Sequence, residues 1–261
     1  MAQVEANGIT QYYDVQGDGP PLLLVAGMGG TANYWAEQVA FFSRTNTVIS
    51  YDQRGTGRTS HEPVTGIEQL RDDLLALLDA LDFETLDYLG HSTGGNIGQI
   101  MAIENPERLR KLVIYASTTH GDAYRSKVWR VRRSILEKQG AELYGDMTSL
   151  MLYPPDWIAE NSELLEKQQA AQVAMLAPVP VMTSRIEAVQ AFDRRHQLSD
   201  IDVPTLVFCA RDDHQTPAYF SAALAEAIPG AEYSLLDYGG HACSRTVPDE
   251  FNKIVADFFA R

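Results

Sequence analysis

The chain has 261 residues, of which 45% are hydrophobic, and its 35 acidic and 21 basic side chains give a formal net charge of −14. Nucleic acid and anionic membranes would repel such a charge, so we expect neither as a partner. The two cysteines, Cys209 and Cys243, lie outside any metal-ligand spacing and argue against both a disulfide framework and a zinc site.

Short apolar runs alternate with helical patterns along most of the chain. Asn7-Gly8 separates two alternating runs, residues 3–5 and 9–15, and predicts an antiparallel hairpin. Strands that alternate with helices predict an α/β fold, with a mostly parallel eight-stranded sheet and helices on both of its faces. Residues 22–26 are a continuous apolar run, as expected of a strand buried on both faces. The further strands are expected at residues 47–51, 86–90, 112–116, 204–209 and 232–236.

Helices are expected between these strands, and one group of them stands apart. Thr65 and Glu68 form a capping box that predicts the start of an amphipathic helix. The alternation stops at Ser117, and residues 118–184 show helical stretches without a convincing strand. We therefore expect a helical cap over 118–184, inserted into a core made of residues 1–117 and 185–261. Helices are expected at residues 33–43, 96–104, 124–139, 144–151, 156–175, 186–192, 217–228 and 248–260.

Gly90, Ser92 and Gly94 form a Gly-x-Ser-x-Gly pattern between an apolar strand and a helix. Glycine on either side lets the strand and helix backbones approach closely, and strain at the serine lifts its hydroxyl out of the sheet. The helix N-terminus beneath it can receive an oxyanion. We expect Ser92 to be a nucleophile; the alternative is a structural glycine-rich turn.

The stretch from Gly27 to Gly30 follows a buried strand but lacks the spacing of a nucleotide-binding loop. It predicts an oxyanion loop, in which the backbone N–H groups of Met28 and Thr93 face a substrate carbonyl; the alternative is a plain strand–helix turn. Asp52 and Arg54, after the next strand, are expected to brace their loop rather than to catalyse.

A serine nucleophile needs a base, and that base needs a carboxylate to orient it. Among the six histidines, His241 combines a preceding strand, two glycines and a following helix, and we expect it to be the base. The acid is expected in Asp212 or Asp213, which follow another strand. The order serine, aspartate, histidine is typical of α/β-hydrolases.

Two motifs resemble the α/β-hydrolase superfamily, and the likeness extends along nearly the whole chain: Gly90-His91-Ser92-Thr93-Gly94-Gly95 and Asp52-Gln53-Arg54-Gly55-Thr56-Gly57. The resemblance implies the α/β-hydrolase fold. It also implies that the acid stands four residues before a proline, which selects Asp213 because Pro217 follows it.

Within the superfamily, the segments 152–157 and 238–243 are similar to the aminoacrylate/carbamate hydrolases of bacterial pyrimidine degradation. Members of that group often carry alanine at the position of Ser92. The serine in this chain favours nucleophilic hydrolysis of an ester or a lactone over simple addition of water.

We therefore expect a serine hydrolase without cofactor or metal, acting on a small ester, lactone or carbamate. The alternatives are a small-molecule receptor on the same fold and a cofactor-free perhydrolase. We expect a monomer or a homodimer. We expect it in the cytoplasm, because the N-terminus lacks a signal peptide. The basic run 130–133 is expected to be a solvated face. The aromatic side chains expected beside the substrate, with ordinary core packing as the alternative, are Trp35, Trp129, Tyr153 and Trp157.

Overall fold

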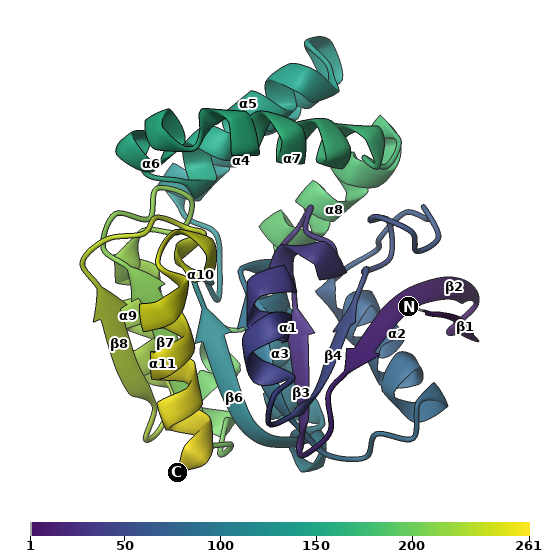
Figure 1. Cartoon of the computed structure of the whole chain (residues 1–261), viewed down its shortest axis with the longest axis vertical. Helices are drawn as coiled ribbons and strands as arrows, with labels where there is room; N and C mark the ends of the chain where they lie inside the picture. Colours follow the sequence, from purple (N-terminus) through teal and green to yellow (C-terminus); the bar gives the residue numbers. More distant parts are fainter. Residues whose placement is uncertain (1) are drawn as a thin grey trace.

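One mixed sheet runs through the molecule (Figure 1). In residues 2–261, which the computed structural model describes, eight strands follow the order β1-β2-β4-β3-β5-β6-β7-β8. β2 is antiparallel to β1 and β4, and every other neighbouring pair is parallel. The predicted α/β class is confirmed. The strands are β1 (Ala2–Ala6), β2 (Ile9–Gln16), β3 (Pro21–Val25), β4 (Thr47–Tyr51), β5 (Leu86–His91), β6 (Leu109–Tyr115), β7 (Thr205–Ala210) and β8 (Glu232–Leu236).

The predicted hairpin joins β1 to β2, and its two turn residues explain why it forms. Asn7 and Gly8 have φ of 50° and 73°, the left-handed conformation that a tight hairpin turn requires. Asn7 also donates from its amide to Asp73 Oδ1 at 2.6 Å, which ties the hairpin to a helix on the sheet.

Helices cover both faces of the sheet, and alternate residues of β3 show how the two cores are built. Leu23 and Val25 pack in the cluster that includes side chains of α2, α3 and α9, whereas Leu22 and Leu24 pack with those of α1 and α11. A strand buried on both faces therefore reads as a continuous apolar run. The helices of these two layers are α1 (Ala36–Phe42), α2 (Ile67–Ala80), α3 (Thr93–Glu104), α9 (Ala218–Ala227), α10 (Cys243–Thr246) and α11 (Pro248–Ala260).

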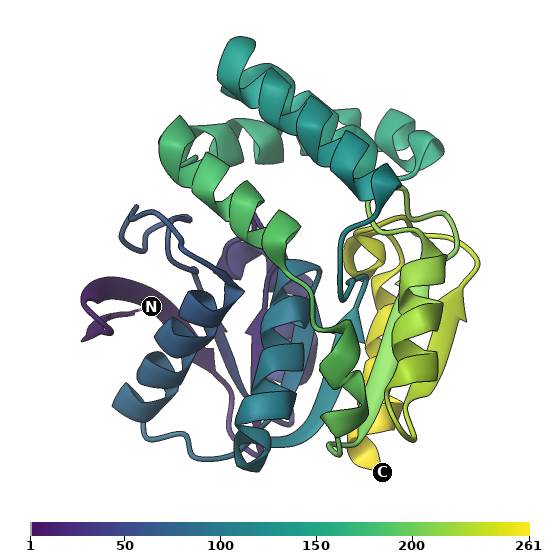
Figure 2. The ribbon, with the colours of Figure 1, turned by 180° about the vertical axis from the view of Figure 1, so that it is seen from behind.

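Five further helices come between β6 and β7, and most of them lie across one end of the sheet (Figures 1 and 2). The last, α8, runs from this layer down to the sheet in both views, so the cap boundary expected at residue 184 falls inside a helix. They are α4 (Ala123–Lys138), α5 (Ala141–Leu152), α6 (Pro155–Glu160), α7 (Ser162–Ala174) and α8 (Val179–Ala191).

Four local predictions are wrong. The helix expected over 186–192 is the last part of α8, which begins at Val179. The helix expected over 156–175 is two helices, separated at Asn161, whose side-chain amide donates back to Trp157 O at 2.9 Å. The helix expected over 33–43 begins as a 3-10 turn, Ala32–Trp35, before α1. Thr65 bonds Gln69, and Glu68 instead pairs with Arg194, so the capping box does not form.

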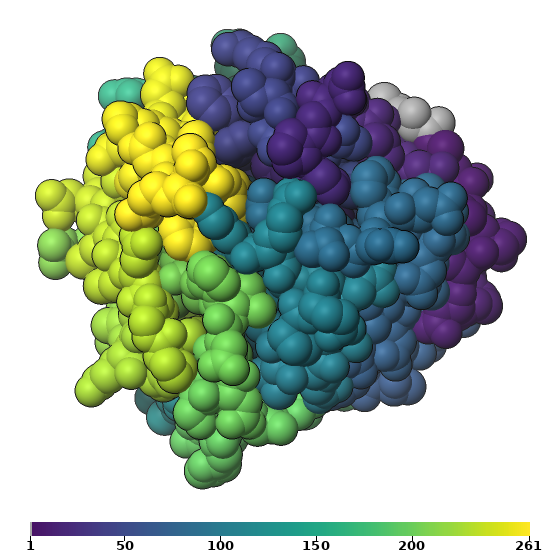
Figure 3. All heavy atoms as spheres, turned by 90° about the horizontal axis from the view of Figure 1, so that it is seen from below, coloured from purple at the N-terminus to yellow at the C-terminus, as the bar shows by residue number. Residues whose placement is uncertain are grey.

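At the opposite end of the molecule the chain near residue 110 lies beside the C-terminal helix (Figure 3). Lys111 donates to the carbonyl oxygens of Phe258 and Phe259 at 3.1 and 3.0 Å, which satisfies acceptors in the last turn of α11. Among residues 2–261, no helix combines the length and the apolar character that a membrane span requires.

Candidate active site

Ser92 stands between β5 and α3 with φ 53° and ψ −113°, a strained conformation that the surrounding contacts hold in place. Its amide donates to Tyr115 O at 2.8 Å, and Ser117 Oγ donates to its carbonyl at 2.7 Å. A Cβ at Gly94 would lie 2.2 Å from Val25 O, so the close approach of β3 requires glycine there. The turn is thus built around the serine from three neighbouring strands.

Asp213 and His241 form a buried pair after β7 and β8. His241 Nδ1 lies 2.8 Å from Asp213 Oδ2, and the other carboxylate oxygen accepts the backbone N–H groups of Gln215 and Thr216 at 2.7 and 2.8 Å. Thr216 Oγ1 also donates to Oδ2 at 2.9 Å. A carboxylate held in this way fixes the Nδ1-protonated tautomer and leaves Nε2 free to accept a proton.

Asp212 has a different role from its neighbour. Its two carboxylate oxygens accept the backbone N–H groups of Gly239 and Gly240 at 3.1 and 2.9 Å. These glycines have φ of 135° and 67° and turn the chain toward His241. Asp213, and not Asp212, therefore contacts the imidazole, whereas Asp212 holds the loop that carries it.

Ser92 and His241 line one cavity of about 360 Å³. Among the hydrogen bonds within residues 2–261, none joins Ser92 Oγ to His241 Nε2. In empty active sites this bond is often long, and it tightens when substrate binds. Ser92 and His241 thus border the same cavity, but their side chains are not hydrogen-bonded to each other.

His91 precedes the serine but serves the loop of His241. Its ring stacks between Tyr34 and Tyr115, with centroids 4.7 and 4.6 Å away, and its Nε2 lies 3.0 Å from His241 O. Because a carbonyl only accepts, His91 must carry its proton on Nε2. Burial and the nearby His241 hold the pKa of His91 well below its usual value, so the ring stays neutral.

The predicted oxyanion loop borders the same cavity. Met28 lines the cavity, and a Cβ at Gly27 would lie 3.2 Å from Ser92 Cβ. Within residues 2–261, neither the Met28 nor the Thr93 amide donates to a protein acceptor, so both N–H groups are available. Thr93 is the first residue of α3, where amides have no intrahelical partner.

Arg185, which the sequence reasoning missed, holds the loop of residues 27–30 by a hydrogen bond to its backbone. It comes from α8, is wholly buried, and donates from Nε to Met28 O at 2.9 Å. It also donates to Arg54 O and, at 2.8 Å, to Gln53 Oε1. Burial lowers the pKa of Arg185 to about 10. An arginine in a mainly apolar helix is the one signal that could have revealed it.

The loop after β4 is a brace, as expected, although its arginine has an unexpected partner. Asp52 accepts the backbone N–H groups of Ala32 and Arg58 at 2.7 and 2.9 Å. Arg54 pairs with Asp73 of α2, with both side chains buried and N–O distances of 2.7 Å. Neither Asp52 nor Arg54 lines the cavity.

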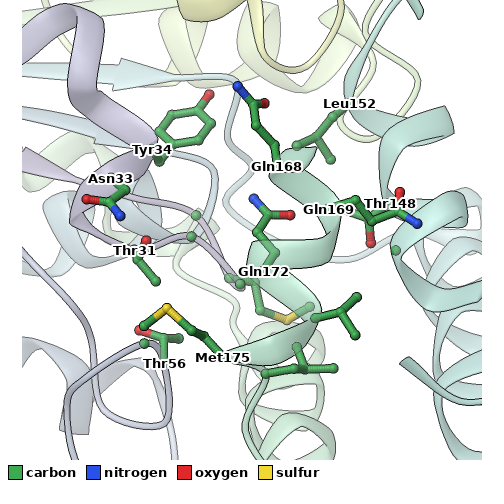
Figure 4. A pocket seen from close by; sticks show the side chains of 18 of the residues that line it. Thr31, Asn33, Tyr34, Thr56, Thr148, Leu152, Gln168, Gln169, Gln172 and Met175 are labelled. Atoms are coloured by element: carbon green, nitrogen blue, oxygen red, sulfur yellow. The ribbon is translucent and has the colours of Figure 1, made fainter. Parts of the chain in front are cut away.

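The wall opposite the serine comes from the covering helices. Trp129 of α4 lines the cavity together with Arg132 and Tyr144. Arg132 is buried, so the expectation of a solvated face over residues 130–133 is wrong at this position. Figure 4 shows the residues that line the cavity on two facing sides: Thr31, Asn33 and Tyr34 on one, and Gln168, Gln172 and Met175, from α7 and its C-terminal end, on the other.

Three of the four aromatic side chains expected beside the substrate lie outside this cavity. Trp35 is wholly buried against Tyr34 and Phe251 in the core between the sheet and α11, where its apolar surface packs best. Tyr153, at the end of α5, and Trp157 of α6 stack on each other, with 4.8 Å between their ring centroids. Only Trp129 of the four borders the space above Ser92.

The chain resembles known hydrolases over nearly its whole length. Residues 20–243 match the model of the alpha/beta hydrolase fold family. Two proteins named "Putative carbamate hydrolase RutD" are 41% identical (Azorhizobium caulinodans) and 36% identical (Agrobacterium fabrum), each covering 95% of this chain and 94% and 97% of their own.

Among solved structures, the enol-lactonase from Burkholderia xenovorans LB400 is 27% identical, covers 100% of both chains and has a TM-score of 0.92. The mixed, mostly parallel sheet with helices on both faces agrees with the fold of these proteins. The chain therefore belongs to the α/β-hydrolase family and is an enzyme of the hydrolase class.

Proposed function

We propose that the protein is a serine hydrolase that cleaves a small ester, lactone or carbamate through an acyl-enzyme on Ser92. The observation that carries the proposal is the Asp213–His241 pair, with 2.8 Å between Nδ1 and Oδ2, whose imidazole lines the same cavity as the strained Ser92. The names of the similar proteins, a carbamate hydrolase and an enol-lactonase, support the same substrate classes.

The proposed reaction has two stages, acylation of Ser92 and hydrolysis of the acyl-enzyme. Ser92 Oγ attacks the substrate carbonyl while His241 Nε2 takes its proton, and Asp213 stabilises the resulting imidazolium. The negative oxygen is held by the N–H groups of Met28 and Thr93. His241 then protonates the leaving group, and a water molecule, activated by the same imidazole, releases the acyl group.

Labelling with a serine-directed phosphonate, read by intact mass and peptide mapping, tests the nucleophile. We expect one adduct, on Ser92. The Ser92→Ala variant should show no adduct, whereas Ser162→Ala, which changes an exposed serine of α7, should label like the wild type. A folded wild-type protein that gains no adduct would refute the acyl-enzyme and favour a receptor role.

A substrate panel then tests the reaction class. The panel contains p-nitrophenyl esters, p-nitrophenyl carbamates and simple lactones. The wild type should hydrolyse compounds of these classes, and Ser92→Ala should lose activity by several orders of magnitude. Retention of wild-type rates in Ser92→Ala would show that water is activated without the serine, which contradicts the proposal.

A further inference from the structure

Arg132 of α4 is a buried arginine at the cavity wall. Arg132 is only 5% exposed, yet it lines the cavity that Ser92 and His241 also line. The next residue, Arg133, faces outward and pairs with Glu137 and Glu187 at 2.7 and 2.9 Å. One turn of helix thus carries a solvated arginine with acidic partners and a buried one at the site.

All the partners that the structure gives Arg132 are neutral. Nη1 donates to Gln215 Oε1 at 2.9 Å, and Nη2 donates to Thr148 Oγ1 at 2.9 Å and Tyr144 OH at 3.3 Å. The guanidinium lies over the rings of Trp129 and Tyr144, 4.8 and 5.2 Å from their centroids. Within residues 2–261, no carboxylate lies within salt-bridge distance of it.

The guanidinium is left with unused donors. Arginine has five N–H groups and keeps its charge in proteins, and three of the five are used here. Nε is buried without any acceptor, and Nη1 retains a second N–H. A buried charge without a counter-ion is costly, and a bound anion would offset that cost.

Other arginines of the molecule lack this combination. Arg54 has the carboxylate of Asp73, and Arg185 is away from the cavity with three carbonyl acceptors. Arg245 also lines the cavity and has the neutral partners Tyr153 and Gln168, but it is only half-buried, and Glu37 is close enough to it to interact electrostatically. Among the described residues that line the cavity, Arg132 is thus the buried arginine with no carboxylate within salt-bridge distance.

On the basis of the function proposed above, we propose that the substrate is an anionic ester, lactone or carbamate whose carboxylate pairs with Arg132. A carboxylate could accept from the second N–H of Nη1, in a charge-assisted hydrogen bond that is stronger than one between neutral groups. Gln215, which accepts a hydrogen bond from Arg132, lies two residues after Asp213 and also borders the cavity. The anion would therefore lie near the loop that carries Asp213 and Gln215. A local cation is needed because the protein as a whole, at −14, repels anions.

A pair of matched esters tests the charge preference. Monomethyl glutarate carries the carboxylate, and methyl glutaramate replaces it with a neutral amide of the same shape. We expect the wild type to favour the anion in kcat/KM by roughly 10- to 100-fold, the range typical of a charged hydrogen-bonded pair. No preference for the anion in the wild type would overturn the proposal without any variant.

Three variants assign the preference to one side chain. Arg132→Gln should remove the preference, because kcat/KM should fall far more for the anionic ester than for the neutral ester, and Arg132→Lys should keep part of the preference because the charge remains. Arg133→Gln, on the solvated side of the same turn, should behave as the wild type. An equal loss for both esters in Arg132→Gln would mean a packing role and would overturn the proposal.

Calorimetric binding to Ser92→Ala separates this inference from the proposed function. The serine-less protein should bind monomethyl glutarate more tightly than the amide, and the added Arg132→Gln change should equalise the two. If Ser92 resists the phosphonate but this anion preference persists, the acyl-enzyme fails and the anion site stands. If Ser92 is labelled and the wild type hydrolyses the neutral ester as well as the anionic one, the anion site is refuted while the acyl-enzyme stands.

Discussion

Replacing Asp213 by Asn should nearly abolish activity without unfolding the protein, and the contacts of the carboxylate show why. Oδ1 accepts two backbone N–H groups, from Gln215 and Thr216, so the oxygen of an asparagine would remain on that side. Its NH₂ group would then face His241 Nδ1, which must accept rather than donate. The imidazole would carry its proton on Nε2, where it cannot take one from Ser92.

In serine hydrolysis the wrong tautomer lowers kcat by about 10⁴-fold, which is about 5.4 kcal/mol of transition-state stabilisation. Asp212→Asn is the matched control: it loses the charge and one of the two hydrogen bonds from Gly239 and Gly240, because an amide NH₂ cannot accept, but it leaves the tautomer of His241 unchanged, so we expect a loss of at most about tenfold. The assay is kcat and KM on a p-nitrophenyl ester, with folding checked by circular dichroism. A kcat of Asp213→Asn within tenfold of the wild-type kcat would refute the reasoning. So would a larger loss of kcat in Asp212→Asn than in Asp213→Asn.

Three further outcomes follow from the structure. Burial lowers the pKa of His91, so below about pH 6.5 the folded state binds fewer protons than the unfolded state. The contribution of His91 to the free energy of unfolding is therefore fully present above that pH. It falls as the pH drops, by up to about 1.4 kcal/mol per pH unit. His91→Asn should flatten this slope in urea unfolding between pH 7 and 5, and an unchanged slope would contradict it. Gly94→Ala places a Cβ 2.2 Å from Val25 O and should cost at least about 3 kcal/mol in urea unfolding, whereas Gly121→Ala, with its nearest atom at 3.8 Å, should be nearly neutral. Arg185→Lys should lower kcat by about tenfold with little change in KM, because the Met28 peptide loses its anchor; a change confined to KM would argue against this role.

The parts of the fold that follow from local pattern could be predicted from the sequence. A continuous apolar run such as residues 22–26 predicts a buried strand. The glycines around Ser92 predict a tight turn, and a Cβ at Gly90 or Gly94 would indeed lie 2.4 or 2.2 Å from a backbone oxygen. His241 stood out because a strand, two glycines and a helix fix where its loop must lie. The choice between Asp212 and Asp213 rested on resemblance, since both follow the same strand end.

The side chains that depend on contacts between distant segments could not be predicted. Arg132 and Arg133 are adjacent in a basic run, and only the packing of α4 over the cavity buries one and exposes the other. Arg185 meets the loop of Met28 across 157 positions. Trp35 and Trp157 are typical of either a substrate wall or a core, and helical periodicity alone does not separate these uses.

Mass spectrometry of the protein quenched during turnover of p-nitrophenyl acetate tests the central claim most directly. The account predicts an acetyl group on the peptide that contains Ser92, formed as p-nitrophenol is released and lost as turnover ends. The same ester hydrolysed at the wild-type rate by Ser92→Ala, or an acetyl group carried by another residue at the catalytic rate, would contradict it.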